Sequence, residues 1–128
     1  MKRISIAVLF LVAALIVLMA PVACSSGGGE EIDADITINL NANNSLFDKG
    51  SITVPAGATV AIIFENKESI MHNFALYDSS ALNTSYFIGE LIGKKTVTYV
   101  FTAPSQPGTY FFRCDVHPIT MTGDFIVT

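Results

Sequence analysis

Four side chains in the second half of the chain are of types that bind soft transition metals. Cys114, His117 and Met121 lie within one short stretch, and His72 is the only other histidine. Thiolate and thioether sulfurs suit Cu(I), and imidazole suits both oxidation states of copper. Two histidines, one cysteine and a weakly bound methionine form the ligand set of blue copper electron-transfer sites. The residue types and their spacing therefore predict a type 1 copper site.

Each of these residues has an ordinary structural explanation when it is taken alone. A lone buried cysteine or methionine is usually a core residue, and a lone histidine is usually satisfied by hydrogen bonds. The combination favours a metal. If the leader segment described below exports the domain, its one cysteine cannot form an internal disulfide and an unprotected thiol is open to oxidation. Met71 is a possible rival ligand. If His72 lies on an extended strand, however, its neighbour points to the opposite face, so we expect Met71 in the core.

The chain after about residue 35 predicts an all-β domain that would hold these side chains. Apolar and polar residues alternate in several short runs, which is the period of a half-buried strand. Turn-forming residues separate the runs, which lie at 36–40, 52–54, 60–64, 74–76, 97–101, 110–114 and 125–127. Many short strands with turns between them favour a β-sandwich or barrel. Only residues 79–92 could hold one short helix.

Residues 1–23 predict an export signal of the lipoprotein type. Two basic residues precede an apolar run from Ile4 to Ala20, which is slightly shorter than the about 20 residues of a spanning helix. The segment Val22–Ala23–Cys24 resembles a bacterial lipobox, in which the cysteine is lipidated and becomes the first mature residue. Pro21 stands where a lipobox usually has Leu. An uncleaved signal anchor is the alternative, and either form would export the domain and tether it to the outer face of the cell membrane.

Composition limits the rest of the chain to one acidic domain. Residues 24–34 are rich in Ser, Gly and acids without an apolar period, so we expect a flexible tether there. Residues 35–128 suffice for one compact domain and are too few for two. After the leader, five basic residues stand against eleven acids, a net charge of −6 that would repel a polyanion. We expect a monomer that does not bind nucleic acid.

From about Asp35 to Thr128 the chain resembles the cupredoxins, the family of plastocyanin, azurin and amicyanin. The matching segments are Ile52–Gly57, Val60–Asn66, His72–Phe74, Pro107–Tyr110 and the loop from Cys114 through Val127. The resemblance implies a Greek-key β-sandwich or barrel with one copper ion, and together with the leader it implies a bacterial or archaeal lipoprotein. It also implies that His72, Cys114 and His117 are the equatorial ligands and Met121 the axial one.

Two further residues are expected to act on the ligands. By resemblance, Asn73 ties the two ligand loops together through hydrogen bonds. Val116 stands where plastocyanin and amicyanin have proline, and unlike proline it carries an N–H. We expect this N–H to donate to the Cys114 thiolate, withdraw electron density and raise the reduction potential. The spacing from His117 to Met121 falls between those of plastocyanin and amicyanin, which leaves the axial distance open.

The resemblance implies an electron-transfer protein rather than an enzyme. His117 would be the electron port, with Pro118 and Ile119 framing an apolar docking patch for an unidentified redox partner. Multicopper oxidases and copper nitrite reductases need further histidines, and the chain has none left. An extracytoplasmic protein for copper storage or delivery is the alternative, since it could use the same ligands with quick metal exchange. A metal-free immunoglobulin-like domain would leave the coincidence of the four side chains unexplained.

Overall fold

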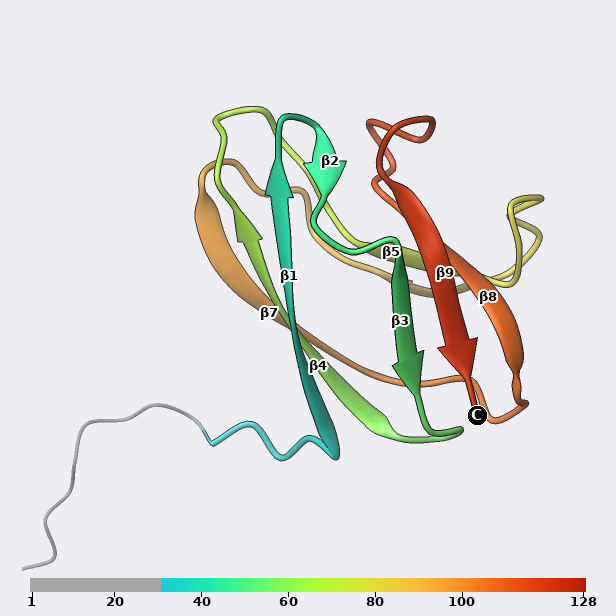
Figure 1. The fold of residues 1–128 in the computed structure, drawn as a ribbon. Helices are drawn as coiled ribbons and strands as arrows, with labels where there is room; N and C mark the ends of the chain where they lie inside the picture. Colours follow the sequence, from blue (N-terminus) through green and yellow to red (C-terminus); the bar gives the residue numbers. More distant parts are fainter. Residues whose placement is uncertain (1–30) are drawn as a thin grey trace, which may run out of the picture. The chain divides into compact units, whose positions relative to one another are not determined.

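Residues 31–128, which the computed structural model describes, form a sandwich of two β-sheets (Figure 1). The strands are β1 (Ile36–Asn43), β2 (Leu46–Phe47), β3 (Ser51–Val54), β4 (Thr59–Asn66), β5 (Ala75–Tyr77), β6 (Ser85–Ile88), β7 (Lys95–Thr102), β8 (Gly108–Arg113) and β9 (Thr122–Val127). The all-β prediction is confirmed. The predicted signal segment, Cys24 and most of the predicted tether lie outside the described residues. Within 31–128, no helix is long and apolar enough to cross a membrane.

The strand order brings the two predicted ligand loops together. One sheet has the order β2-β1-β4-β7 and the other β3-β9-β8-β5-β6. The pairs β1–β4 and β3–β9 are parallel, and the remaining pairs are antiparallel. Because β5 and β8 pair antiparallel with Ala75 opposite Arg113, the start of β5 lies beside the end of β8. The residues just before Ala75 therefore meet the residues just after Arg113.

Aromatic side chains in the core anchor both ligand loops. Phe74 and Phe112 are fully buried, and their ring centroids are 5.4 Å apart. Phe74 also stacks on Phe101, with centroids 5.8 Å apart. Burial of such a side chain contributes about 1.5–3 kcal/mol, and each aromatic pair adds about 0.5–1.5 kcal/mol. Since Phe74 follows His72 closely and Phe112 precedes Cys114 closely, both loops start from well-packed positions.

The short helix that could have occupied residues 79–92 is absent, and this segment instead contains β6. The carboxylate of Asp78 accepts hydrogen bonds from the amides of Ser79 and Thr84, which closes a loop before the strand. Leu82 has a positive φ of 57°, which interrupts any helical run. The Tyr-Phe-Ile sequence that follows favours an extended strand.

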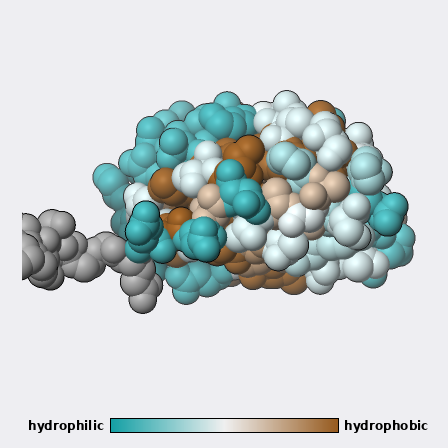
Figure 2. Space-filling model, turned by 90° about the horizontal axis from the view of Figure 1, so that it is seen from below, coloured by the Kyte–Doolittle hydropathy of each residue, from teal (hydrophilic) through white to brown (hydrophobic). Residues whose placement is uncertain are grey.

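The two ends of the sandwich differ in surface character. The end opposite the ligand loops, seen from below, shows hydrophilic residues around smaller hydrophobic areas (Figure 2). The ligand end exposes several large apolar side chains from its loops and from the start of β2, namely Leu46, Ile70, Met71, Val116 and Ile119. Large exposed apolar side chains of this kind are candidates for contact with another molecule.

Candidate metal centre

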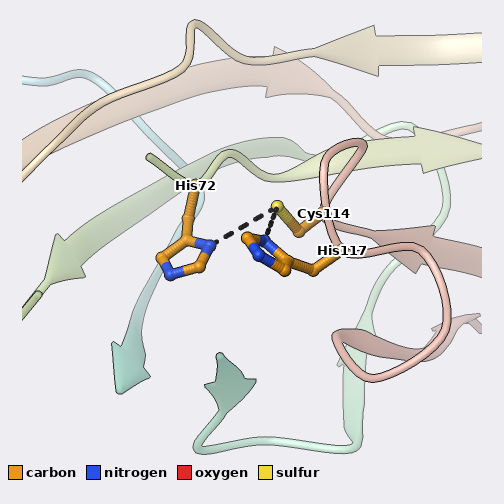
Figure 3. A group of neighbouring side chains, drawn as sticks. All are labelled: His72, Cys114 and His117. Atoms are coloured by element: carbon orange, nitrogen blue, oxygen red, sulfur yellow. Dashed lines mark hydrogen bonds between the residues drawn. The ribbon is translucent and has the colours of Figure 1, made fainter. Parts of the chain in front are cut away.

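Three of the predicted ligands form one compact cluster. The candidate ligand atoms of His72, Cys114 and His117 all lie within 4.8 Å of one another. The Cys114 Sγ atom is 3.7 Å from Nδ1 of His72 and 3.9 Å from Nδ1 of His117 (Figure 3). Three donors bound about 2.1 Å from a central ion in a trigonal plane would be about 3.6 Å apart. The observed spacing therefore fits a single small ion.

Backbone hydrogen bonds fold the Cys114–Met121 loop into a tight structure. The Cys114 amide donates to the carbonyl of Met121 at 2.9 Å, and the Met121 amide donates to the carbonyl of His117 at 3.0 Å. The His117 amide donates to the carbonyl of Cys114 at 3.2 Å. Met121 is fully buried beside the cluster. The loop thus holds a thiol, an imidazole and a thioether close together.

Most of the cluster is shielded from solvent. His72 and Cys114 are fully buried, whereas His117 is partly exposed. Burial protects the free thiol of Cys114 from oxidants, which resolves the liability of a lone cysteine. His117 is thus the most solvent-accessible of the three side chains.

Asn73 bridges the two loops, as the resemblance implied. Its side-chain oxygen accepts a hydrogen bond from the Asp115 amide at 2.8 Å. Its side-chain nitrogen donates to the Asp115 carboxylate at 3.2 Å and to the carbonyl of Gly89 at 3.0 Å. Asn73 is buried, so these bonds satisfy its polar atoms away from water.

Asp115 lies at the centre of a group of hydrogen-bonded polar side chains that the sequence analysis did not identify. Its carboxylate accepts hydrogen bonds from the Tyr77 hydroxyl at 2.8 Å and from Arg113 Nε at 2.9 Å. Partial burial alone would raise the pKa of this carboxyl, but the bonds from Tyr77, Asn73 and Arg113 outweigh it and hold the pKa below its ordinary value. The opposite charges on either side of Cys114 were the available signal in the sequence.

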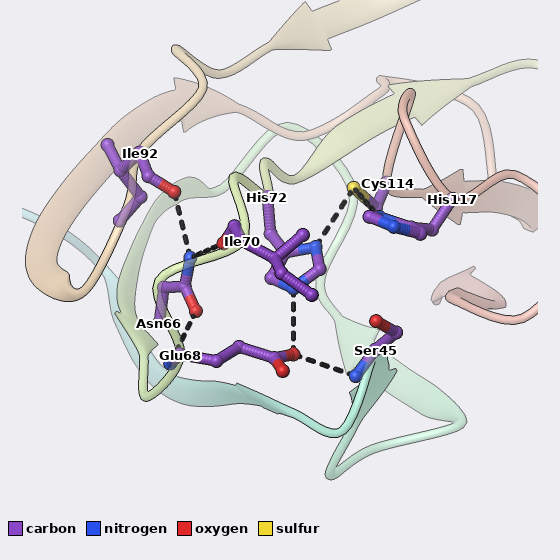
Figure 4. Close-up of polar contacts among 8 residues, drawn as sticks. All are labelled: Ser45, Asn66, Glu68, Ile70, His72, Ile92, Cys114 and His117. Atoms are coloured by element: carbon purple, nitrogen blue, oxygen red, sulfur yellow. Dashed lines mark hydrogen bonds and ion pairs between the residues drawn. The ribbon is translucent and has the colours of Figure 1, made fainter.

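Glu68 is a second residue that the sequence analysis missed. Its carboxylate Oε1 lies 2.8 Å from Nε2 of His72 and accepts a hydrogen bond from the Ser45 amide at 2.7 Å (Figure 4). The Ser45 amide and the hydrogen bond with His72 lower the pKa of Glu68. A glutamate four residues before a histidine was the only local signal of this contact.

Two expectations about neighbouring residues have different outcomes. Met71 is 49% exposed, so the expectation that it belongs to the core is wrong. The alternation that excluded it as a ligand holds, because His72 points inward and Met71 outward. Val116 is partly exposed in the turn closed by the bond between His117 and Cys114. The hydrogen bond from its amide to the thiolate stays a prediction.

Comparison with known proteins assigns the chain to a family. The cupredoxin-like domain family matches residues 8–127. The chain belongs to this family. This cupredoxin is 30% identical to auracyanin-A of Chloroflexus aurantiacus, over 91% of this chain and 95% of the relative.

Solved structures agree with the fold of this cupredoxin. Auracyanin A of Chloroflexus aurantiacus, a "blue" copper protein, superposes with a TM-score of 0.63 at 28% identity, over 72% of this chain and 98% of that one. Reduced auracyanin from Roseiflexus castenholzii gives a TM-score of 0.65 at 26% identity, over 72% and 96% of the two chains. Amicyanin from Paracoccus versutus gives a TM-score of 0.55 at 26% identity, over 77% of this chain and 86% of the amicyanin chain.

The donor set of this cupredoxin fits copper. His72, Cys114, His117 and Met121 are positioned as a type 1 site. Thiolate and thioether sulfurs are soft donors, which suit copper better than hard cations such as Mg²⁺ or Ca²⁺.

Proposed function

We propose that this cupredoxin is a blue copper electron-transfer protein, tethered to the outer face of the cell membrane. The observation that carries the proposal is the buried cluster of Cys114 Sγ with Nδ1 of His72 and of His117. These three atoms would hold the copper, and Met121 would be a weak axial donor. Bound copper supplies a one-electron couple between Cu(I) and Cu(II). The match to auracyanin A, a "blue" copper protein, supports the same assignment.

The chain's own contribution is to keep the ligands in one arrangement. Three backbone hydrogen bonds close the loop from Cys114 to Met121. Asn73 joins that loop to the loop of His72 through Asp115. A preorganised site of this kind needs little movement when the charge of the metal changes. Fast electron transfer benefits from that small reorganisation.

His117 is the proposed route for electrons between the site and a partner. It is partly exposed, and the neighbouring Ile119 is 89% exposed. An apolar patch around the exposed histidine would let a redox partner approach closely and exclude water, without a large charged interface. Both histidines of the chain belong to this site, so none remains for a catalytic copper centre that needs more of them. We therefore propose that the protein is an electron carrier and not an enzyme.

Optical and EPR spectra of the full-length protein, loaded with Cu(II) in detergent, test this function. We expect an intense blue absorption that ascorbate bleaches and an oxidant restores. Cys114→Ser should remove the blue band, because a hydroxyl is a poor, hard donor to copper. Cys24→Ser is the matched control and should keep the band. A blue Cys114→Ser protein would contradict the site, and colourless copper that chelators remove within seconds would favour storage or delivery.

A further inference from the structure

The two ring nitrogens of His72 face different partners. Nδ1 lies 3.7 Å from Cys114 Sγ, within the metal cluster. Nε2 lies 2.8 Å from the carboxylate of Glu68, and the His72 side chain is fully buried while that of Glu68 is one-fifth exposed. An ionised carboxylate can only accept hydrogen bonds, so Nε2 must carry the proton. The Nδ1 lone pair is then free to bind a metal.

Ser45 and Asn66 hold Glu68 in place, and Asn66 is in turn fixed by two backbone carbonyls (Figure 4). The Ser45 amide donates to Oε1 of Glu68 at 2.7 Å, and the Glu68 amide donates to Oδ1 of Asn66 at 3.0 Å. The buried side-chain nitrogen of Asn66 donates to the carbonyls of Ile70 and Ile92, at 2.7 and 2.8 Å. The loop from Asn66 to His72 is thus fixed from both sides. The carboxylate has little freedom to leave the imidazole.

The turn that presents the Ser45 amide has a conformation that side chains rarely adopt. Asn44 and Ser45, which join β1 to β2, have φ angles of 53° and 52°. Two consecutive residues with positive φ are typical of a type I′ hairpin turn, where Asn and Gly are preferred and Ser is less common. Such local strain persists where surrounding contacts favour it, often next to functional sites. Here the Ser45 amide points at Glu68, the carboxylate that contacts the ligand.

We propose that Glu68 is a positioning residue that fixes the tautomer of His72 and lowers the reduction potential of the copper site. This inference rests on the proposed function. A carboxylate that accepts the distal N–H of a ligating histidine raises the basicity of the ligand. The negative charge also favours Cu(II) over Cu(I), and its low exposure limits screening by solvent. Reduction of a copper ion held here would take one electron from the redox partner and would require no bond to Glu68 to break.

Glu68→Gln tests the role of the charge, because it keeps the shape and an acceptor oxygen. Both neighbours of Oε1, the Ser45 amide and His72 Nε2–H, are donors, so the amide oxygen of Gln should take its place. We expect the blue site to form and the ratio of Cu(II) to Cu(I) affinity to fall about tenfold. For a one-electron couple, that is a potential about 59 mV more positive by voltammetry.

The matched control is Glu65→Gln, which removes the same charge three residues earlier. The Glu65 side chain is 48% exposed and pairs with Lys67 at 3.9 Å. Solvent screens such a charge, so we expect a much smaller shift of the reduction potential than in Glu68→Gln. An equal shift in both variants would show a general charge effect and overturn the role of Glu68. A blue Glu68→Gln protein with an unchanged potential would also overturn it, while leaving the proposed function intact.

A second readout does not depend on copper. Nitrogen-15 NMR of the copper-free protein should show a slowly exchanging, downfield Nε2–H on His72, because this N–H is buried and a carboxylate accepts it. Glu68→Ala should lose this signal, and Glu68→Gln should retain part of it. The signal persisting in a folded Glu68→Ala protein would refute the positioning role. A wild-type protein that shows this signal but never turns blue would refute the proposed function alone.

Discussion

The two methionines within the described residues differ in burial, and this separates an axial donor from a surface residue. Met121 is fully buried beside the cluster, whereas Met71 is 49% exposed. We predict that Met121→Leu keeps the blue colour and raises the reduction potential, because loss of a weak axial donor disfavours Cu(II). Methionine and leucine side chains have similar volumes, so Met121→Leu should lower the free energy of unfolding by less than about 1.5 kcal/mol. Voltammetry measures the shift.

Met71→Leu is the matched control for that experiment. It makes the same chemical change next to a ligand, but on a side chain that points away from the cluster. Its potential should equal that of the wild type. A Met121→Leu protein whose potential is unchanged or lower would mean that Met121 is core filler and not an axial ligand.

At the residue level, the ligands could be predicted but most of their supports could not. Soft donors are few in residues 35–128, so the types and spacing of Cys114, His117 and Met121 suffice. Asn73 could be assigned only through the family resemblance. The contact between Glu68 and His72 depends on the path of a loop, and the amide of Ser45 comes from a distant hairpin. Neither the loop path nor the distance between the two segments is encoded in local spacing.

Among the elements, β9 has a glycine at its second position, Gly123, that the packing requires. A Cβ atom on Gly123 would lie 2.7 Å from the carbonyl oxygen of Gly50 and would overlap the ring of Phe112. We predict that Gly123→Ala destabilises the copper-free protein by about 1–3 kcal/mol, since a core aromatic ring or a strand must move. Urea unfolding followed by circular dichroism measures the loss.

Gly50→Ala is the control, because a Cβ there meets no heavy atom within 4 Å. Its stability should stay within about 0.5 kcal/mol of the wild type. If both variants unfold at the same urea concentration, the close approach of β9 to Phe112 does not prevent a side chain at residue 123.

The strands were easier to predict from sequence than their partners. The two-residue period located most of the long strands because one face of each packs on the core. The two-residue strand β2 is too short to show a period, and β6 was obscured by the residues around it. The parallel pairs β1–β4 and β3–β9 join segments that are separated by other strands in the sequence. Such pairing is set by tertiary packing, which local patterns do not report.

For the whole molecule, the proposed site and the proposed anchor lie in separate parts of the chain. The ligands belong to residues 72–121, and the lipobox-like segment precedes the described residues. The acidic domain, with a net charge of −6 after the leader, would be repelled by anionic lipid headgroups. Both proposed anchors, a lipid on Cys24 and an uncleaved apolar leader, would agree with this charge, whereas electrostatic attachment would not. Removal of the anchor should leave the copper site unchanged.

We predict that the mature protein begins at Cys24, carries lipid there and sediments with membranes after a high-salt wash. Acyl chains gain about 0.8 kcal/mol for each buried CH₂ group, and this apolar attachment is insensitive to salt. Cys24→Ser should block both lipid attachment and lipoprotein-type processing of the leader, while the blue spectrum of the copper-loaded protein stays the same. Cys114→Ser is the reciprocal control, which should lose the colour and keep the lipid. Mass spectrometry of the native N-terminus decides between the alternatives, because an unmodified Cys24 behind an intact leader from Met1 would establish an uncleaved signal anchor instead.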